Sequence, residues 1–357
     1  MKKEHILIIR FSAMGDVAMT VPVVYSLATQ YPDLRITVLS RGFARPFFEN
    51  LASNVDFMEA DLKGEYRGVK GLNALYRRLT AKKFTMIADL HNVLRSDYLR
   101  MRFNLSHYRV EHISKNRRQR RALVAKNNKV LEPLPTSFER YAEVFEKLGY
   151  PVKLEFHSLF PPEGGDLCLL PATVGQKQET GPWIGIAPTA AHPGKCYPAD
   201  QMRKVVEQLT VSHPQARLFL FGRGQEEDQL FNEWCATFPQ CVYVSRHLED
   251  LRQELILMSR LDVMLSMDSA NMHLASLTAT PVVSIWGATH PYAGFMGWGQ
   301  SPENAIQTEL ACRPCSIYGN RLCYRGDMAC MNRIQPEQSV ERIEHIINNP
   351  QTNQVRL

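Results

Sequence analysis

Short apolar runs recur along the chain and alternate with stretches of helical period. In the first half, apolar runs cover residues 5–10, 35–40 and 85–90, and helical patterns cover residues 17–31, 71–81 and 138–148. A continuous apolar run of this length is typical of a buried parallel strand, and apolar residues spaced three and four apart indicate a helix. The alternation predicts an α/β domain with a doubly wound parallel sheet.

The same alternation restarts in the second half, with apolar runs at residues 183–187, 217–221, 242–244, 262–265 and 281–285. Residues 151–180 are rich in proline and glycine and have little periodicity, which is typical of a linker. We predict an N-terminal Rossmann-like domain over 1–158, a linker over 159–180, a C-terminal Rossmann-like domain over 181–335, and a helix and tail over 336–357. Ligands of such sheets bind at the carboxyl ends of the strands, so the two domains are expected to face a central cleft.

The composition is that of a globular protein, with 45% hydrophobic and 22% charged residues among 357. The first apolar run is cut by Arg10 and is too short for a signal peptide. No uninterrupted apolar stretch of about 20 residues occurs, so we expect no transmembrane helix and a cytoplasmic location.

Positive charge is concentrated in the first half. Residues 1–155 carry a net charge of +11 and the remainder −5, within a total of +6. This asymmetry predicts an anionic partner, which is nucleic acid, acidic lipid headgroups or a phosphorylated or carboxylated sugar. No helix-turn-helix or aromatic-interleaved pattern supports nucleic acid. The basic residues 115–121 fit an anionic acceptor or an inner-membrane surface, and equally a solvated helix face.

Two loops that follow strands carry candidate chemistry. Asp16 follows the first strand beside Gly15, where it is a candidate general base or simply a helix cap. Thr189 and Lys195 follow the strand at 183–187, where a lysine and backbone donors suit a diphosphate, although loop lysines are more often solvated.

Two further loops point to a nucleotide. Glu226 follows the strand at 217–221, where a carboxylate commonly binds ribose hydroxyls, but the glycines there do not match the fingerprint of dinucleotide oxidoreductases. Asp268, Ser269 and Ala270 precede a predicted helix whose first N–H groups favour a phosphate. His273 lies about one turn further, as a ligand contact or a buried structural histidine.

These motifs together resemble glycosyltransferase family 9, the ADP-heptose:lipopolysaccharide heptosyltransferases, from residue 5 to about 346. The resemblance rests on Ser12-Ala13-Met14-Gly15-Asp16 with Thr20 and Pro22, Lys195 before Tyr197-Pro198, Gly222 with Glu226, Asp268-Ser269 with Asn271-Met272-His273-Leu274-Ala275, then Pro281 and Gly287-Ala288-Thr289.

The resemblance implies a GT-B glycosyltransferase with an acceptor-binding N-terminal domain and a nucleotide-sugar donor-binding C-terminal domain, inverting and without a required metal. Asp16 is then the general base, and Lys195 with Thr189 steadies the donor diphosphate and sugar. Glu226 binds the adenosine ribose, and the remaining donor contacts are Asp268, Ser269, Ala270 and His273. The candidate acceptor-binding residues are Ser12, Met14, Gly15, His91, Arg95 and Arg120.

The expected donor is ADP-heptose and the expected acceptor is an anionic lipopolysaccharide core of the lipid A–Kdo type, with peripheral contact with the inner membrane. The family usually has glycine at the position of Ala270 and Gln-Gly at His91-Asn92, and both departures bear on the substrate. The alternatives are another nucleotide sugar on the same fold, a nucleotide-sugar epimerase, and a noncatalytic nucleotide-sugar or anionic-ligand binding protein.

Four of the eight cysteines cluster near the C-terminus, at Cys312, Cys315, Cys323 and Cys330. One C-x-x-C pair with irregular later spacing is compatible with a structural zinc, with free thiols or with disulfides. Four thiolates leave no open coordination position, so any zinc here is structural. The family resemblance implies that no cofactor is required for catalysis.

Overall fold

The computed structural model describes residues 4–177 and 181–349, so the expected tail at 350–357 and residues 178–180 of the expected linker lie outside the described residues. The chain forms two compact units. The first consists of Met1–Asn116 and Pro135–Leu159, and the second of Arg117–Leu134 and Phe160–Leu357.

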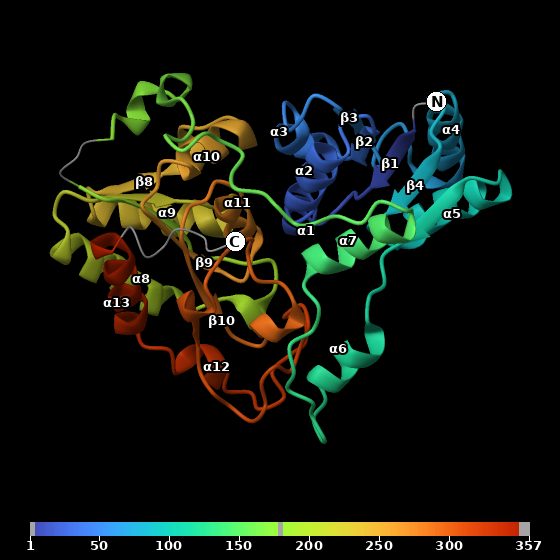
Figure 1. Cartoon of the computed structure of the whole chain (residues 1–357). Helices are drawn as coiled ribbons and strands as arrows, with labels where there is room; N and C mark the ends of the chain where they lie inside the picture. The colour runs from blue at the N-terminus through green and yellow to red at the C-terminus, as the bar shows by residue number, and fades with distance from the viewer. Residues whose placement is uncertain (1–3, 178–180, 350–357) are drawn as a thin grey trace. The chain divides into compact units, whose positions relative to one another are not determined.

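The first unit is built on a five-stranded parallel sheet in the order β3-β2-β1-β4-β5 (Figure 1). Its strands are β1 His5–Ile9, β2 Arg35–Ser40, β3 Val55–Glu59, β4 Met86–Asp89 and β5 Arg109–His112. The central strand β1 is buried along its whole length, which agrees with its continuous apolar sequence.

Helices cover the two faces of the first sheet. They are α1 Met14–Ala18, α2 Val21–Gln30, η1 Gly42–Ala44, α3 Arg45–Phe48, α4 Gly68–Thr80, α5 Leu94–Leu105 and α7 Ser137–Lys147. Leucines of α4 and Leu99 and Phe103 of α5 share one hydrophobic core with Leu7 and Ile9 of β1. Helices α2 and α7 pack together, and the right-handed crossovers of the sheet place them on its other face (Figure 1).

The second unit contains a six-stranded parallel sheet in the order β11-β10-β9-β6-β7-β8. Its strands are β6 Trp183–Ala187, β7 Arg217–Leu220, β8 Cys241–Tyr243, β9 Val263–Met267, β10 Val282–Trp286 and β11 Ala305–Gln307. Its α-helices are α6 Arg117–Leu123, α8 Ala199–Ser212, α9 Gln225–Thr237, α10 Leu251–Met258, α11 Ala270–Leu277, α12 Ala329–Asn332 and α13 Pro336–Asn348.

Short 3-10 turns complete the second unit: η2 Leu167–Leu169, η3 Ala172–Val174, η4 Pro193–Lys195, η5 Val244–Arg246, η6 Pro291–Ala293 and η7 Pro302–Asn304. Apolar residues of α8, α9 and α13 share a core with β6, β7, β9 and β10. Helices α10 and α11 pack together and α11 packs on β9 and β10, so the second sheet is also covered on both faces. Two α/β domains with parallel sheets, as expected from the sequence, are confirmed.

The helix expected over residues 17–31 is wrong as a single element, because the structure has two helices there, α1 and α2. Pro22 has no N–H to donate and occupies the first turn of α2, where helices tolerate proline. At the junction Thr20 Oγ1 donates to Val17 O at 2.7 Å.

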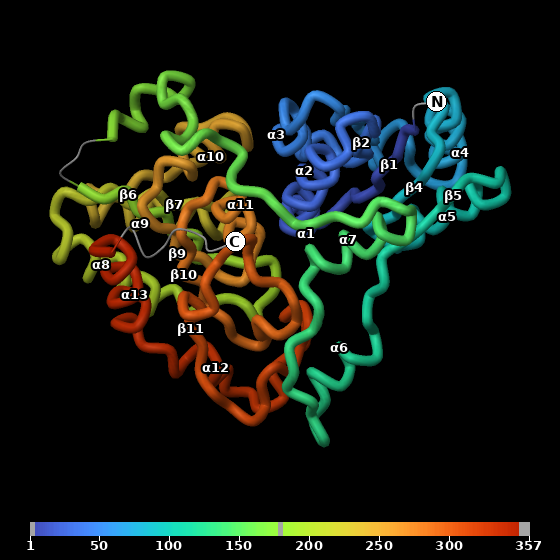
Figure 2. Tube along the Cα trace, in the orientation of Figure 1, coloured from blue at the N-terminus to red at the C-terminus, as the bar shows by residue number. Residues whose placement is uncertain are grey.

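One segment departs from the simple two-halves division. Residues Arg117–Leu134, which the sequence placed within an N-terminal domain of 1–158, pack with the second unit. Figure 2 traces this teal segment beside the orange and red loops of the second unit. Leu134 N donates to Tyr292 O at 2.8 Å, and Lys129 Nζ donates to Cys312 O at 2.8 Å and Pro314 O at 3.0 Å. The chain therefore passes between the units three times.

Among the described residues, no helix is both long enough and apolar enough to span a bilayer.

Candidate active site

The carboxyl ends of four neighbouring strands form one edge of the second sheet. Strands β10, β9, β6 and β7 lie side by side and are parallel, so the loops that follow them meet at this edge. The loops after β6, β7 and β9, with the helices α9 and α11 that follow two of them, carry every residue predicted from the sequence to bind the donor. The structure brings these residues to the same edge of one unit.

A lysine and an aspartate form an ion pair at this edge. Lys195 Nζ lies 2.8 Å from Asp268 Oδ2, and the two side chains are 15% and 3% exposed. An ion pair with so little exposure is screened weakly by salt. The sequence assigned Lys195 to the diphosphate and Asp268 to the sugar, and it did not predict that the two bind each other.

Close packing positions Lys195. The lysine ends the 3-10 turn Pro193–Lys195, in which Gly194 N donates to Gly319 O at 3.2 Å and Ala288 N donates to Gly194 O at 2.8 Å. A Cβ on Gly194 would stand 2.6 Å from Gly319 O, and a Cβ on Gly319 would stand 2.6 Å from Lys195 Cγ. A side chain at Gly194 or at Gly319 would therefore clash with the neighbouring loop or with the Lys195 side chain, so both positions require glycine.

The carboxylate that contacts Thr189 is Glu227, one residue after the predicted Glu226. Thr189 Oγ1 donates to Glu227 Oε1 at 3.0 Å, whereas Glu226 is exposed on the first turn of α9. A Cβ on Gly224, whose φ is +141°, would stand 2.7 Å from Glu227 Oε2. The sequence alone could not predict which of the two adjacent glutamates contacts Thr189, because this depends on the phase of helix α9.

Helix α11 begins at the edge beside the ion pair. Its N-cap is Ser269, whose side chain makes no capping bond and whose Oγ lies 3.2 Å from Ser266 Oγ. The first helical residue, Ala270, is partly exposed, and backbone N–H groups of a first turn have no partner within the helix. His273 is 7% exposed, so it lies inside the unit rather than on its surface.

The first unit carries the predicted base at the end of β1. Asp16 Oδ2 lies 2.7 Å from Arg10 Nη2, and the two side chains are 31% and 9% exposed. Ala13 N also donates to Asp16 Oδ2 at 3.2 Å, so the aspartate does cap the start of α1. Tyr141 OH donates to the backbone oxygen of Asp16 at 3.3 Å. These contacts fix a partly exposed carboxylate, which makes the capping and catalytic roles compatible.

The loop after β4 is organised by a carboxylate that the sequence reasoning did not single out. Asp89 is fully buried, and its Oδ1 accepts from His91 N and Asn92 N, both at 2.9 Å. Its Oδ2 lies 3.2 Å from Arg100 Nη1. Asp89 could have been found from the sequence, because it is an aspartate at the last position of a buried strand.

His91 contacts the Asp16 loop, which carries the predicted acceptor residues Ser12, Met14 and Gly15, with Nε2 at 3.5 Å from Ser12 Oγ. Burial, with the positive charge of Arg10, lowers the pKa of His91 from 6.5 to about 3, so the imidazole is neutral at physiological pH. Met14 and the buried Gly15 belong to α1 itself.

Arg95 and Arg120 belong to different units. Arg95 is exposed in the first turn of α5. Arg120 belongs to the second unit, is 9% exposed, and donates to Tyr318 OH at 2.6 Å. Its guanidinium also lies 5.2 Å from the ring centroid of Phe295. Arg120 is therefore occupied by packing contacts within the second unit.

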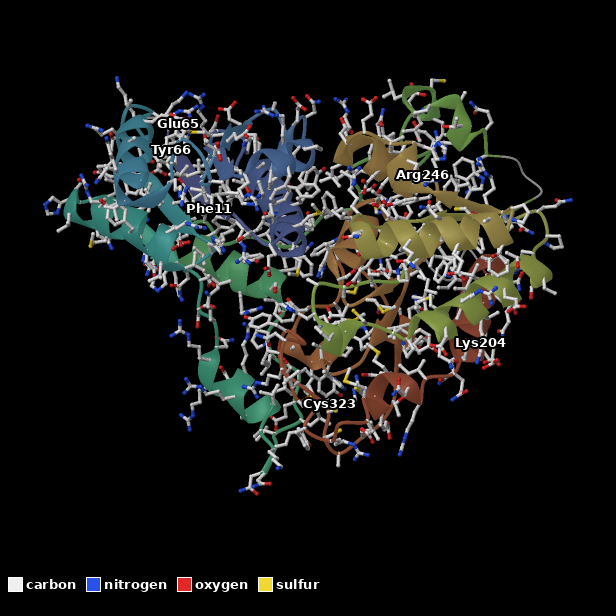
Figure 3. All side chains as sticks on the ribbon, turned by 180° about the vertical axis from the view of Figure 1, so that it is seen from behind. Phe11, Glu65, Tyr66, Lys204, Arg246 and Cys323 are labelled. Atoms are coloured by element: carbon white, nitrogen blue, oxygen red, sulfur yellow. The ribbon has the colours of Figure 1, made fainter. Side chains whose placement is uncertain are left out.

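The cysteine cluster has free thiols. Cys312, Cys315, Cys323 and Cys330 form no disulfide, and the described part of the chain contains no group of three or more His, Cys, Asp or Glu side chains that could hold a metal ion. Figure 3 labels Cys323 in the loop that precedes α12. The geometry gives no support to a structural zinc, because tetrahedral zinc requires four ligands converging on one point.

Similar folds occur among solved glycosyltransferases. A glycosyltransferase of family 9 from Veillonella parvula has a TM-score of 0.73 at 18% identity, with 98% of each chain covered. The E. coli ADP-heptose lipopolysaccharide heptosyltransferase II has a TM-score of 0.67 at 17% identity, with 97% of this chain and 99% of that one covered. E. coli heptosyltransferase WaaC with ADP-2-deoxy-2-fluoro heptose has a TM-score of 0.64 at 15% identity, covering 96% and 99%.

Two parallel-sheet α/β units in one chain, similar to those of these solved structures, make up the GT-B fold. The family model of glycosyltransferase family 9 (heptosyltransferase) matches residues 72–324, and the chain belongs to that family. None of the curated protein sequences compared with the chain matches it.

Proposed function

We propose that this glycosyltransferase moves heptose from ADP-heptose to an anionic lipopolysaccharide-core acceptor, with inversion at the anomeric carbon and without a catalytic metal. The family supports heptosyl transfer, and structural neighbours were solved with ADP or with an ADP-heptose analogue. The observation that carries the catalytic assignment is the Asp16 carboxylate, held at the end of β1 by Arg10 and Ala13 N yet 31% exposed.

The donor diphosphate would lie at the start of α11. Backbone N–H groups at Ser269 and Ala270, together with the Lys195 ammonium, are suited to an anionic group. Asp268 is already paired with Lys195, which reduces its repulsion of a diphosphate and leaves its remaining lone pairs for sugar hydroxyls. Thr189 and Glu227, with Glu226 beside them, would contact the ribose and sugar.

In the proposed step, Asp16 accepts the proton of an acceptor hydroxyl as that oxygen bonds to the anomeric carbon. The bond from the anomeric carbon to the diphosphate oxygen breaks on the opposite side, and its electron pair leaves with ADP. The attack from the opposite side inverts the anomeric configuration. Lys195 offsets the charge that grows on the departing diphosphate, a role that a preorganised cation can fill without a metal.

We place the enzyme in the cytoplasm, in peripheral contact with the inner membrane that holds its acceptor. The first unit keeps a net charge of +6 once the net +5 of residues 117–134 is assigned to the second unit, which is then neutral. The excess positive charge on the first unit supports an anionic acceptor.

The assignment of Asp16 is tested by Asp16→Asn, which keeps the side-chain shape and removes the base. We expect turnover to fall by roughly 1,000-fold or more, while ADP affinity measured by calorimetry stays within about twofold. Asp56→Asn, an exposed carboxylate of the same unit, is the control and should keep full activity. A well-folded Asp16→Asn enzyme with normal turnover would remove the base from the mechanism.

The donor is tested by ligand-induced thermal stabilisation with ADP, UDP and GDP and their sugars, since a ligand that binds the native state raises its stability by mass action. Stabilisation by ADP and ADP-heptose only is the expected outcome. Activity should persist in excess EDTA, and the product should have the opposite anomeric configuration to the donor by NMR. Selective stabilisation by UDP or GDP compounds would exclude ADP-heptose as donor.

A further inference from the structure

Helix α5 presents large apolar side chains to solvent. Leu94, Met101 and Leu105 are 88%, 49% and 71% exposed. Their spacing of seven and four residues places them on one face, whereas Ser96, Leu99 and Phe103 on the opposite face are buried in the core. Surface helices of globular proteins normally carry polar residues at these positions, so an apolar stripe along a whole helix indicates a binding surface.

A basic cavity adjoins this stripe. It has a volume of about 470 Å³ and lies between α4 and α5, where Val69, Lys70, Asn73, Arg77 and Arg102 line it. Val69 is itself 63% exposed, which extends the apolar surface onto α4. The lining contains three cations and no carboxylate, so the cavity suits an anionic group.

Arg102, the least exposed cation that lines the cavity, is held in place. Asn73 Oδ1 accepts hydrogen bonds from Arg102 Nη1 and, at 2.7 Å, from Tyr98 OH. The Arg102 guanidinium also lies 4.5 Å from the ring centroid of Tyr76. An arginine positioned in this way loses less side-chain freedom when it binds a phosphate.

The single carboxylate of α5, Asp97, is paired with an arginine of the same helix, and that arginine is shared with a second carboxylate. The carboxylate of Asp97 is 2.8 Å from Arg100 Nη2, and Arg100 Nη1 also contacts the buried Asp89. The α4–α5 face, meaning Val69, Lys70, Arg77, Arg102 and the stripe of Leu94, Met101 and Leu105, is therefore apolar and positive together.

We infer that the α4–α5 face of the first unit binds the surface of an anionic phospholipid bilayer. The leucines and methionine of α5 enter the boundary between headgroups and acyl chains, and a lipid phosphate occupies the cavity beside Lys70, Arg77 and Arg102. An apolar helical stripe bordered by cations is the chemistry that binds such a surface. A protein partner of matching charge would need its own acidic and apolar face, whereas a bilayer supplies both at any position.

This inference rests on the peripheral membrane contact of the proposed function and deepens it, since it assigns that contact to one face of the first unit. It also differs from the expectation that residues 115–121 contact the membrane, because that segment packs with the second unit and Arg120 is buried there. Vesicle binding needs neither donor nor acceptor, so its failure and the failure of the proposed function are distinguishable.

The test is flotation of the full chain with vesicles of phosphatidylglycerol and phosphatidylcholine, compared with vesicles of phosphatidylcholine alone. We expect binding to the anionic vesicles only, weakened by salt. The variants Met101→Asp with Leu105→Asp, and Lys70→Gln with Arg77→Gln, should each weaken vesicle binding by about tenfold or more. Thermal unfolding of each variant verifies that it is folded.

Matched controls come from the second unit. Val211→Asp changes an apolar residue of α8 that is 75% exposed, and Arg117→Gln with Arg118→Gln removes two exposed cations of α6. Both controls should bind vesicles like the wild type. No binding to anionic vesicles, equal loss in the controls, or unchanged binding in both α4–α5 variants would overturn the inference. So would a dimer in solution that Met101→Asp with Leu105→Asp dissociates, since the face would then join two copies of the chain.

Discussion

Lys195 and Asp268 each hold the other in place as well as facing the proposed donor. Both side chains are largely buried, at 15% and 3% exposed, so removing one leaves a charge that water does not solvate well. A substitution at either position therefore changes both the stability of the fold and the binding of the donor, so the two residues have to be substituted singly and together.

We expect Lys195→Met to lower stability by about 3 kcal/mol and ADP affinity and turnover by roughly 100-fold. Adding Asp268→Asn to it removes the stranded carboxylate, so the double variant should recover most of the stability and none of the activity. Chemical denaturation and ADP calorimetry on the four proteins of the cycle measure this. If the double variant also recovers turnover, the lysine serves only to neutralise the aspartate.

His91 gives a pH dependence of stability. Its pKa falls from 6.5 to about 3 on folding, chiefly through burial, so the unfolded chain binds a proton between these values and the native state does not. Stability is therefore lost as pH falls below 6.5, by about 1 kcal/mol per pH unit. His91→Gln should flatten denaturation midpoints between about pH 6.5 and pH 4. Parallel pH profiles of the two proteins would mean that His91 is protonated in the native state.

At the scale of elements, two glycines in the loop between β11 and α12 can be compared directly. Gly319 and Gly326 both have positive φ, at +75° and +80°, but a Cβ on Gly319 meets Lys195 Cγ at 2.6 Å while a Cβ on Gly326 meets nothing within 4 Å. Alanine at either position incurs the same backbone strain, of about 1 kcal/mol. Any difference between the two variants reports the contact with the lysine stem.

We therefore expect Gly319→Ala to lower ADP affinity by roughly tenfold and stability by about 1–3 kcal/mol more than Gly326→Ala does. Calorimetric titration with ADP and thermal unfolding of both variants provide the comparison. Equal behaviour of the two alanine variants would show that the lysine adjusts without loss.

Elements were predictable from the sequence where both faces of a strand are buried. The runs at 35–40 and 183–187 coincide with β2 and β6, which lie inside their sheets. Strands β3, β5 and β11 were missed, and all three are edge strands with partly exposed residues and no continuous apolar run. Helix α5 was missed for a related reason, since its exposed leucines and methionine erase the contrast between its two faces.

The candidate site was predictable to the level of the loop and not of the contact. Asp16, Lys195, Asp268 and Ser269 all stand at strand ends, as their order along the chain indicated. The pairing of Lys195 with Asp268, and the contact of Thr189 with Glu227, depend on helix phase and on packing across the sheet edge. Neither is encoded in residues that are close in sequence.

At the scale of the whole molecule, the second unit depends on a segment that the first unit encloses in sequence. The Arg120 guanidinium lies 5.2 Å and 5.8 Å from the ring centroids of Phe295 and Tyr318, and Lys129 donates to backbone oxygens of the cysteine loop. All four tryptophans of the chain, Trp183, Trp234, Trp286 and Trp298, lie in the second unit. Tryptophan fluorescence therefore reports unfolding of that unit.

We expect Arg120→Ala to shift the tryptophan-detected unfolding midpoint downward, by about 2 kcal/mol of stability, because it removes a buried hydrogen bond and two cation–π contacts. Arg117→Ala on the exposed face of the same helix should leave the midpoint unchanged. A midpoint insensitive to Arg120→Ala would show that the segment contributes little to the second unit.

Because Arg117–Leu134 packs with the second unit, a single cut in the backbone need not separate the two resulting fragments. A protease site engineered at the exposed Glu163 would divide the chain into fragments 1–163 and 164–357. The first fragment would still carry α6 and Lys129, whose contacts lie on the second. The nicked protein should therefore migrate as one species on a native gel, as a complementing pair of fragments, and separate only when the Arg120 contacts are broken.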